Sequence, residues 1–148
     1  SGGGILYQES DSKVLGVDDF KVVSTRQPTD SEIEDMRFAW CCAKYIKSNA
    51  IVFVKNGMTI GIGCGQPNRL ISAKIAIKNG NDFGFNLNGT VCGSDAFFPF
   101  RDGVDFILES GATAIIQPGG SLKDKDSDRA ARAMFCDISH SSNRSDRQ

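Results

Sequence analysis

The segment of residues 50–62 constrains the fold more strongly than any other part of the sequence. Residues 50–55, AIVFVK, form an apolar run rich in β-branched side chains, which is typical of a buried strand. Asn56 and Gly57 come next, and this pair favours a two-residue hairpin turn because both residues accept a positive φ. Residues 58–62, MTIGI, return as the partner strand. We therefore predict a β-hairpin here.

A helix is predicted before the hairpin. Thr29 and Glu32 have the spacing of a capping box, as do Ser31 and Glu34. Acidic residues in the first turn suit the positive end of the helix dipole. Apolar residues then recur at helical spacing, which predicts one buried face. We expect this helix to end near Ser48.

The rest of the chain is expected to alternate between strands and helices. Residues 69–78 have a helical pattern, and Gly80 is expected to end that helix. The other predicted elements are strands at 5–8, 20–24, 90–93 and 112–117, a helix at 102–109, and a last helix end and strand within 130–137. This alternation predicts an α/β domain with three layers, α/β/α.

Composition narrows the class of protein. The chain of 148 residues suits one domain, and its formal net charge of −1 gives no case for nucleic-acid binding. No apolar run reaches the roughly 20 residues of a membrane-spanning helix, and the start does not resemble a signal peptide. Five cysteines without a C-x-x-C pair predict reduced thiols in a cytoplasmic protein, not disulfides or a structural zinc site. Residues 139–148 are polar and are expected to form a disordered tail.

The glycine-rich run GIGCG, residues 61–65, has two interpretations. A glycine-rich strand end before a helix brings backbone N–H groups close to an anion, and Arg69 can add a bidentate contact to a phosphate or carboxylate. However, the third glycine is misplaced for a dinucleotide-binding fingerprint. The alternative is a tight turn followed by a solvated arginine.

The run SDAFFPFRD, residues 94–102, combines three phenylalanines with two aspartates and an arginine. Aromatic side chains in a turn can form a wall for a flat ring. A carboxylate beside that wall can accept two hydrogen bonds from an amino-pyrimidine edge. For Asp102 the alternative role is a helix N-cap, and for Phe98 and Phe100 it is core packing.

Asn49, Ser121 and His140 are the remaining polar candidates. The Asn49 amide either positions a substrate group or caps the preceding helix. Ser121 follows Pro-Gly-Gly and is a candidate helix cap with free N–H groups behind it. His140 is the single histidine and lies beside the polar tail, so we do not expect it to act as a general base. The H-x-E and P-C-x-x-C signature of zinc deaminases is absent from the sequence.

Several segments together resemble one family. They are RQPT at 26–29, FAW at 38–40, SNAI at 48–51, GIGCGQ at 61–66 with Arg69, SDAFFPFRD at 94–102 and QPGGS at 117–121. In this order they resemble the AICAR transformylase domain of the bifunctional purine-biosynthesis enzymes. The resemblance implies a cytidine deaminase-like α/β/α fold without zinc. It also implies formyl transfer from 10-formyltetrahydrofolate to the amino group of AICAR, an imidazole carboxamide ribonucleotide, in the synthesis of IMP.

The resemblance further implies roles for individual residues. Asn49 is the implied catalytic residue, which orients the AICAR amine and carboxamide, and Arg69 contacts the nucleotide. The implied folate-binding residues are Leu70, Phe97, which stacks on the pterin, Asp102, which reads the amino-pyrimidine edge, and Ser121 and Leu122, which line the pocket.

In this family the transformylase domain has two similar lobes, works as a dimer and builds its site from both subunits. Residues 1–138 resemble the second, C-terminal lobe, so we expect a homodimer or a pairing with the first lobe. IMP cyclohydrolase activity belongs to a separate N-terminal domain of the family.

Two departures from the family affect the expected activity. The catalytic lysine–histidine pair belongs to the first lobe, and residues 123–137 look shortened. We therefore expect the chain to be incomplete as an enzyme. The alternatives are a catalytically silent folate- or nucleotide-binding or dimerisation module, and a truncated product with no folded function.

Overall fold

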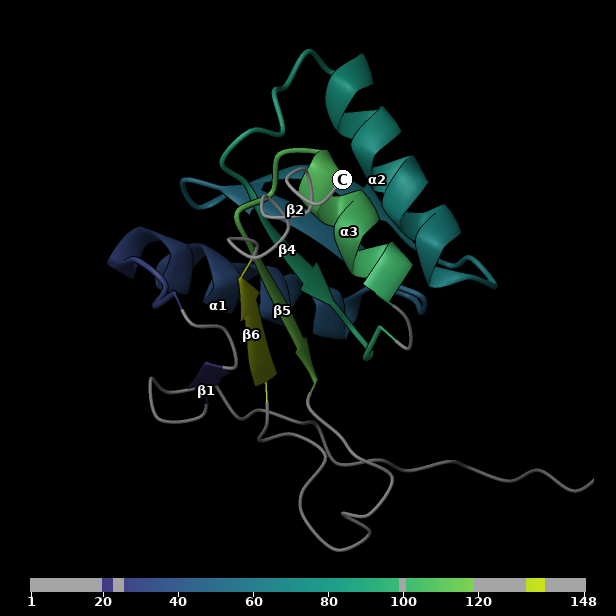
Figure 1. The fold of residues 1–148 in the computed structure, drawn as a ribbon. Helices are drawn as coiled ribbons and strands as arrows, with labels where there is room; N and C mark the ends of the chain where they lie inside the picture. The colour runs from purple at the N-terminus through teal and green to yellow at the C-terminus, as the bar shows by residue number, and fades with distance from the viewer. Residues whose placement is uncertain (1–19, 23–25, 99–100, 119–132, 138–148) are drawn as a thin grey trace, which may run out of the picture.

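A computed structural model of the chain describes residues 20–22, 26–98, 101–118 and 133–137. Its elements, in chain order, are β1 (Phe20–Val22), α1 (Asp30–Tyr45), β2 (Ile51–Lys55), β3 (Met58–Gly63), α2 (Arg69–Asp82), β4 (Val91–Ser94), α3 (Arg101–Glu109), β5 (Ala114–Pro118) and β6 (Ala133–Asp137). The strands form one sheet in the order β1-β6-β5-β4-β2-β3 (Figure 1). Within it β4 and β5 are parallel, and β2 is antiparallel to both of its neighbours.

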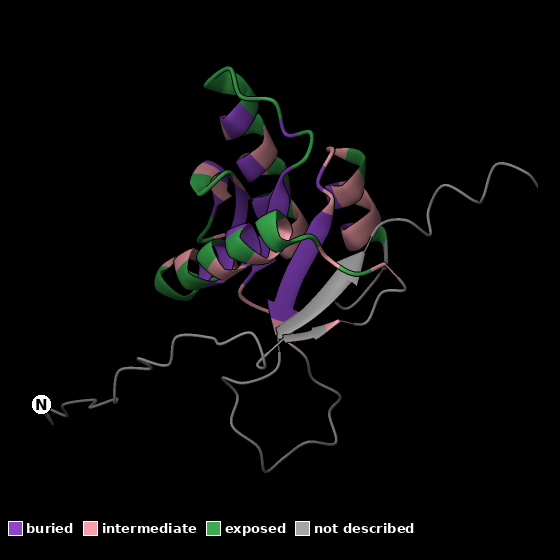
Figure 2. Ribbon diagram, turned by 90° about the vertical axis from the view of Figure 1, so that its left-hand side faces the viewer, coloured by how far each residue is buried: buried purple, intermediate pink, exposed green. Residues whose placement is uncertain are grey.

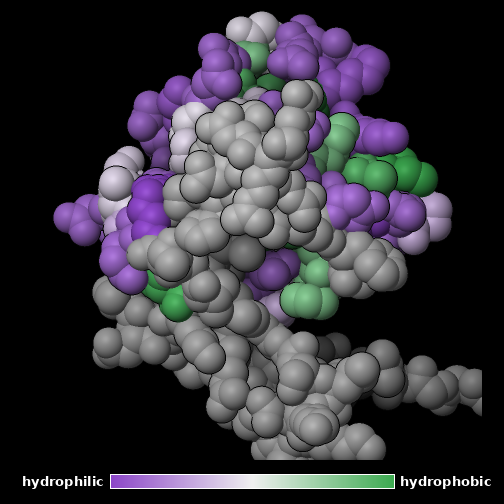
Figure 3. All heavy atoms as spheres, viewed as in Figure 1, coloured by the Kyte–Doolittle hydropathy of each residue, from purple (hydrophilic) through white to green (hydrophobic). Residues whose placement is uncertain are grey.

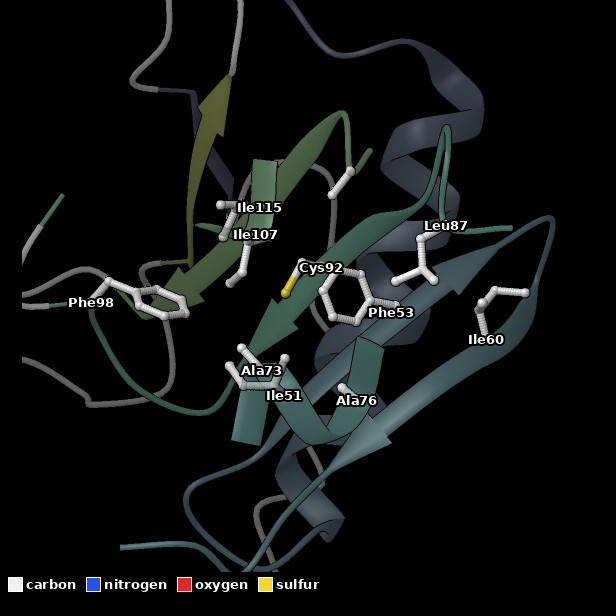
Figure 4. Packing of buried hydrophobic residues seen from close by; sticks show 11 residues of the cluster. Ile51, Phe53, Ile60, Ala73, Ala76, Leu87, Cys92, Phe98, Ile107 and Ile115 are labelled. Carbon is white, nitrogen blue, oxygen red and sulfur yellow. The ribbon is translucent and has the colours of Figure 1, made fainter. Parts of the chain in front are cut away.

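Helices cover both faces of this sheet. Because side chains of a strand point alternately to opposite faces, Val52 and Val54 of β2 pack with α1, whereas Ile51 and Phe53 pack with α2 and α3. Figure 4 shows Phe53 and Cys92 side by side in this second cluster. The central strands are buried along their length between the helices (Figure 2). The predicted three-layer α/β/α fold is confirmed.

The predicted hairpin is also confirmed. β2 pairs with β3, and the turn residues Asn56 and Gly57 have φ values of 52° and 71°. Asp35 of α1 holds this turn, because its carboxylate accepts a hydrogen bond from the N–H of Asn56 at 2.9 Å and from that of Gly57 at 2.7 Å. The carboxylate is buried, so the turn supplies the hydrogen bonds that its charge requires.

α1 begins with the predicted capping box of Thr29 and Glu32. The Glu32 carboxylate also accepts two hydrogen bonds from Arg26, each at 2.8 Å, and one from the Thr113 hydroxyl at 2.9 Å. Burial alone would raise the pKa of Glu32. The hydrogen bonds from Arg26, Thr29 and Thr113 outweigh this effect and lower the pKa to about 2. The start of α1 is thereby tied to the residue that precedes β5.

Two predicted helix ends are wrong. α1 ends at Tyr45 and not near Ser48, because extended backbone follows directly. α2 continues through Gly80 to Asp82. Gly80 is buried, and a Cβ there would lie 3.2 Å from the carbonyl oxygen of Ile60. This glycine therefore permits close helix packing and does not end the helix.

Glycines inside β3 bring α2 close to the sheet. A Cβ at Gly61 would lie 2.1 Å from the carbonyl oxygen of Ala76, and a Cβ at Gly63 would lie 1.8 Å from that of Ser72. Only glycine permits this approach of helix backbone to strand backbone. Gly65 lies in the turn that follows, with a φ of 67°. Neither interpretation of the glycine-rich run anticipated the helix contact.

The other predicted elements are confirmed where the structure describes them. β1, β4, α3, β5 and β6 overlap the segments predicted at 20–24, 90–93, 102–109, 112–117 and 130–137. The strand predicted at 5–8 and the tail at 139–148 lie outside the described residues. Hydrophilic residues cover most of the described surface on the face shown in Figure 3. Within the described ranges, no helix combines the length and apolar character that crossing a membrane requires.

Candidate functional site

Several segments meet at one edge of the sheet. β2 begins and β4 ends there, because these strands are antiparallel and Ile51 pairs with Ser94. β3 ends at the same edge, and α2 begins shortly after it. β5 also ends there because it is parallel to β4. We define the edge cluster as the four polar residues Ser48, Asn49, Arg69 and Asp95.

Asn49 is held through both its backbone and its side chain. Its backbone N–H and its side-chain Nδ2 donate to the carbonyl oxygen of Gln66, at 3.3 and 2.8 Å. Its carbonyl oxygen accepts from Ser72 Oγ at 2.7 Å, and Oδ1 accepts from Arg69 Nη2 at 2.8 Å. These bonds use one N–H and one lone pair of the side-chain amide. Within the described part of the chain, no hydrogen bond uses the second N–H or the second lone pair.

Arg69 connects Asn49 with the segment after β4. Its Nη1 donates to the carbonyl oxygen of Phe97 at 3.1 Å, while Nη2 donates to Asn49. The guanidinium carbon lies 5.8 Å from the centre of the Phe98 ring, a distance at which a cation is attracted to an aromatic face. The side chain is only 17% exposed. The interpretation of Arg69 as a solvated residue is therefore wrong, and its predicted nucleotide contact stays a prediction.

Asp95, like Ser48, is a member of the edge cluster to which the sequence analysis assigned no individual role. Its Oδ1 accepts from the N–H of Ala50 at 3.0 Å, and its Oδ2 accepts from Ser48 Oγ. Oδ1 also lies 4.0 Å from Arg69 Nη2. The available sequence signal was its position, directly after a strand and inside the run of residues 94–102. Its two hydrogen-bond partners, Ser48 and Ala50, lie more than forty residues away in the chain, so no local pattern indicated them.

Of the predicted folate-side residues, Phe97 lies next to the edge cluster, because its carbonyl oxygen accepts from Arg69. Phe97 is 46% exposed, whereas Phe98 is buried and its N–H donates to Gln117 Oε1 at 3.0 Å. This confirms core packing for Phe98. Asp102 is exposed in the first turn of α3 and accepts from the N–H of Gly103 at 2.9 Å. α3 begins one residue earlier, at Arg101, so Asp102 is not its N-cap.

The start of α3 lies against the phenylalanine that follows Phe97. A Cβ on Gly103 would come within 2.8 Å of Phe98 Cδ1. Phe97, whose carbonyl oxygen accepts from Arg69, therefore lies close to the turn that carries Asp102. Leu70 follows Arg69 in α2, is half-buried, and donates its N–H to Asn68 Oδ1 at 2.7 Å.

Four candidate residues fall outside the described part of the chain, namely Phe100, Ser121, Leu122 and His140. Their predicted roles stay predictions. Among the residues that the structure describes, no group of three or more His, Cys, Asp or Glu side chains is arranged to hold a metal ion.

The fold, the edge cluster and Phe97 define a class of protein: a three-layer α/β/α domain that presents a fixed amide, a half-buried guanidinium and an exposed phenyl ring at one edge of its sheet. The family model described as AICARFT/IMPCHase bienzyme matches residues 1–79, which is more than half of the chain. The chain therefore belongs to this family of bifunctional purine-biosynthesis enzymes. The matched segment contains Asn49 and Arg69 and ends before Phe97.

Proposed function

We propose that this chain is the folate-facing, C-terminal lobe of an AICAR transformylase domain and that residues 1–138 form this lobe. In this proposal it takes part in the transfer of a formyl group from 10-formyltetrahydrofolate to the amine of AICAR. The observation that carries the proposal is the pair of hydrogen bonds that the Arg69 side chain donates. It joins the amide of Asn49 to the carbonyl of Phe97 and so links the proposed AICAR-binding group to the proposed folate-binding one.

The edge cluster, together with Phe97 and Asp102, has the chemistry that this substrate pair requires. AICAR carries an amine next to a carboxamide, and the Asn49 amide can accept from the first and donate to the second. Its plane is fixed before any ligand binds, which lowers the entropic cost of orienting the amine for attack. Phe97 offers an exposed ring for the pterin, and Asp102 offers an exposed carboxylate for its amino-pyrimidine edge.

The same proposal makes the lobe incomplete as a catalyst. Amine attack on the formyl donor requires removal of a proton, and none of the four residues of the edge cluster is a histidine or a lysine. In the proposal the general base is the lysine–histidine pair of the first lobe, supplied by a dimer partner or by a separate chain. The expected compartment is the cytoplasm, because the five cysteines include no C-x-x-C pair and are expected to be reduced thiols.

Calorimetric titration of the full chain with a non-reactive folate analogue, with and without AICAR, tests the binding half of the proposal. Saturable binding of both ligands is expected. Phe97→Ala and Asp102→Ala should each reduce the affinity for the folate analogue by about tenfold or more. Phe83→Ala is the matched control, because Phe83 is 79% exposed at the far end of α2. If the control weakens binding as much as Phe97→Ala, the assigned folate site is wrong.

A second candidate function is a catalytically silent binding or dimerisation module, which the lack of a general base in the edge cluster favours. Addition of the first lobe in trans separates the two functions. Restored formyl transfer supports the transformylase, and ligand binding without turnover supports the silent module. A ring-closure assay with formylated AICAR completes the test. Cyclohydrolase activity in this chain would contradict both the transformylase and the silent-module functions.

A further inference from the structure

Asp95 holds both chain neighbours of Asn49, one through its side chain and the other through its backbone. Its Oδ2 accepts from the hydroxyl of Ser48, and its Oδ1 accepts from the N–H of Ala50 at 3.0 Å. The backbone N–H of Asp95 in turn donates to the carbonyl oxygen of Ala50 at 3.2 Å. Asn49 itself makes no described hydrogen bond with Asp95. One carboxylate therefore fixes both neighbours of the proposed catalytic amide without occupying the amide.

The negative charge of Asp95 also faces the positive charge of Arg69. Its Oδ1 lies 4.0 Å from Nη2 of Arg69, the same nitrogen that donates to Asn49 Oδ1. The two side chains are only 13% and 17% exposed. A poorly hydrated guanidinium is held in place more firmly when a carboxylate lies nearby. Asp95 thus acts on Asn49 by a second route, through the arginine that orients its amide.

We propose that Asp95 is a positioning residue for the Asn49 amide, setting its orientation for the amine and carboxamide of AICAR. This inference rests on the proposed function, in which Asn49 contacts AICAR. The competing role is a purely structural one, in which Asp95 stabilises the end of β4 and affects all ligands equally. The two roles differ in how strongly they affect Phe97, because the described link from Asp95 to Phe97 is indirect and runs through Arg69.

The test compares Asp95→Asn with two other variants of the full chain. Asparagine keeps the size of the side chain and an acceptor for the N–H of Ala50, but it removes the charge that faces Arg69. Asp95→Glu restores the charge on a longer side chain. Asp82→Asn is the control for loss of one negative charge, because Asp82 is exposed at the last turn of α2.

Two readouts are measured on ¹⁵N-labelled protein. The side-chain NH₂ resonances of Asn49, assigned by their loss in Asn49→Asp, report the orientation of the amide without any ligand. Calorimetry reports the affinities for AICAR and for a folate analogue. In Asp95→Asn the Asn49 resonances should shift, AICAR affinity should fall by about tenfold or more, and folate-analogue affinity should fall by clearly less, because Asp95 reaches Phe97 only through Arg69. Asp95→Glu should recover part of the AICAR affinity, and Asp82→Asn should match the unmodified chain.

Other outcomes overturn the inference in distinguishable ways. Unchanged Asn49 resonances with unchanged AICAR affinity would show that Asp95 does not position the amide. Equal losses of AICAR and folate-analogue affinity, together with a lower melting temperature, would establish the purely structural role. If the unmodified chain binds neither ligand, the proposed function fails. The Asn49 resonances then still decide whether Asp95 sets the amide geometry.

Discussion

Replacing Gly63 by alanine tests the close contact between α2 and β3. The new Cβ would lie 1.8 Å from the carbonyl oxygen of Ser72 and 2.6 Å from its carbonyl carbon, whereas real Cβ atoms essentially never approach within 3.0 Å. The obstacle is helix backbone, which cannot rotate away as a side chain can. α2 must therefore move away from the sheet by more than about 1 Å and loosen the packing of Ala73 and Ala76.

Overpacking of a core costs about 1–3 kcal/mol and occasionally more. Because backbone must move, we expect Gly63→Ala to lower the free energy of unfolding by about 3 kcal/mol or more. Urea unfolding followed by circular dichroism measures this value. The same shift would displace Ser72, whose hydroxyl donates to the carbonyl of Asn49. The mutant should therefore also bind AICAR more weakly than its folded fraction alone explains.

Gly57→Ala is the matched control. Gly57 has a φ of 71°, and a Cβ added there would have no other atom within 4 Å, so only backbone strain is introduced, at a cost of about 1–2 kcal/mol. A loss of stability in Gly63→Ala no larger than in Gly57→Ala would refute the reasoning. It would mean that α2 does not rest on the strand as the structure has it.

Two further predictions concern carboxylates of α1, the buried Asp35 and the half-buried Glu32. Asp35→Ala removes the acceptor for two N–H groups of the hairpin turn and should reduce the free energy of unfolding by about 1–3 kcal/mol. The loss should be smaller in Asp35→Asn. Equal stability of the two variants and the unmodified chain in urea would contradict this prediction. The pKa of Glu32 is lowered from 4.5 to about 2, so its contribution to stability is fully present above about pH 5 and is lost as the pH falls toward 2. Glu32→Gln should therefore flatten the dependence of the melting temperature on pH in that window, and a slope as steep as in the unmodified chain would count against the assignment.

Local patterns predicted the parts of the fold that depend on neighbours in the sequence. The hairpin turn at Asn56 and Gly57 and the capping box at Thr29 could be predicted because a few adjacent residues determine each of them. The prediction for Gly80 was wrong because its role depends on the carbonyl of Ile60, twenty residues earlier in the chain. A glycine that permits helix packing and one that ends a helix look alike in sequence.

The candidate site was predictable in part for the same reason. Asn49 and Arg69 could be selected by residue type and by resemblance, but their hydrogen bond joins positions twenty residues apart and required the fold. Asp95 was missed because its acceptor roles arise only when the end of β4 meets the start of β2. The sequence could indicate which residues have useful chemistry, but not which of them hold the others in place.

The candidate site and the longest exposed loop of the described residues lie at opposite ends of the sheet. All members of the edge cluster lie where β2 begins and β4 ends, while the opposite end carries the turn at Asn56 and the loop of residues 83–89 between α2 and β4. Most residues of that loop are exposed. Exposed loops are where inserted sequence is tolerated best. The loop is thus a natural attachment point for a fluorophore or an affinity tag that reports on the protein without disturbing ligand binding.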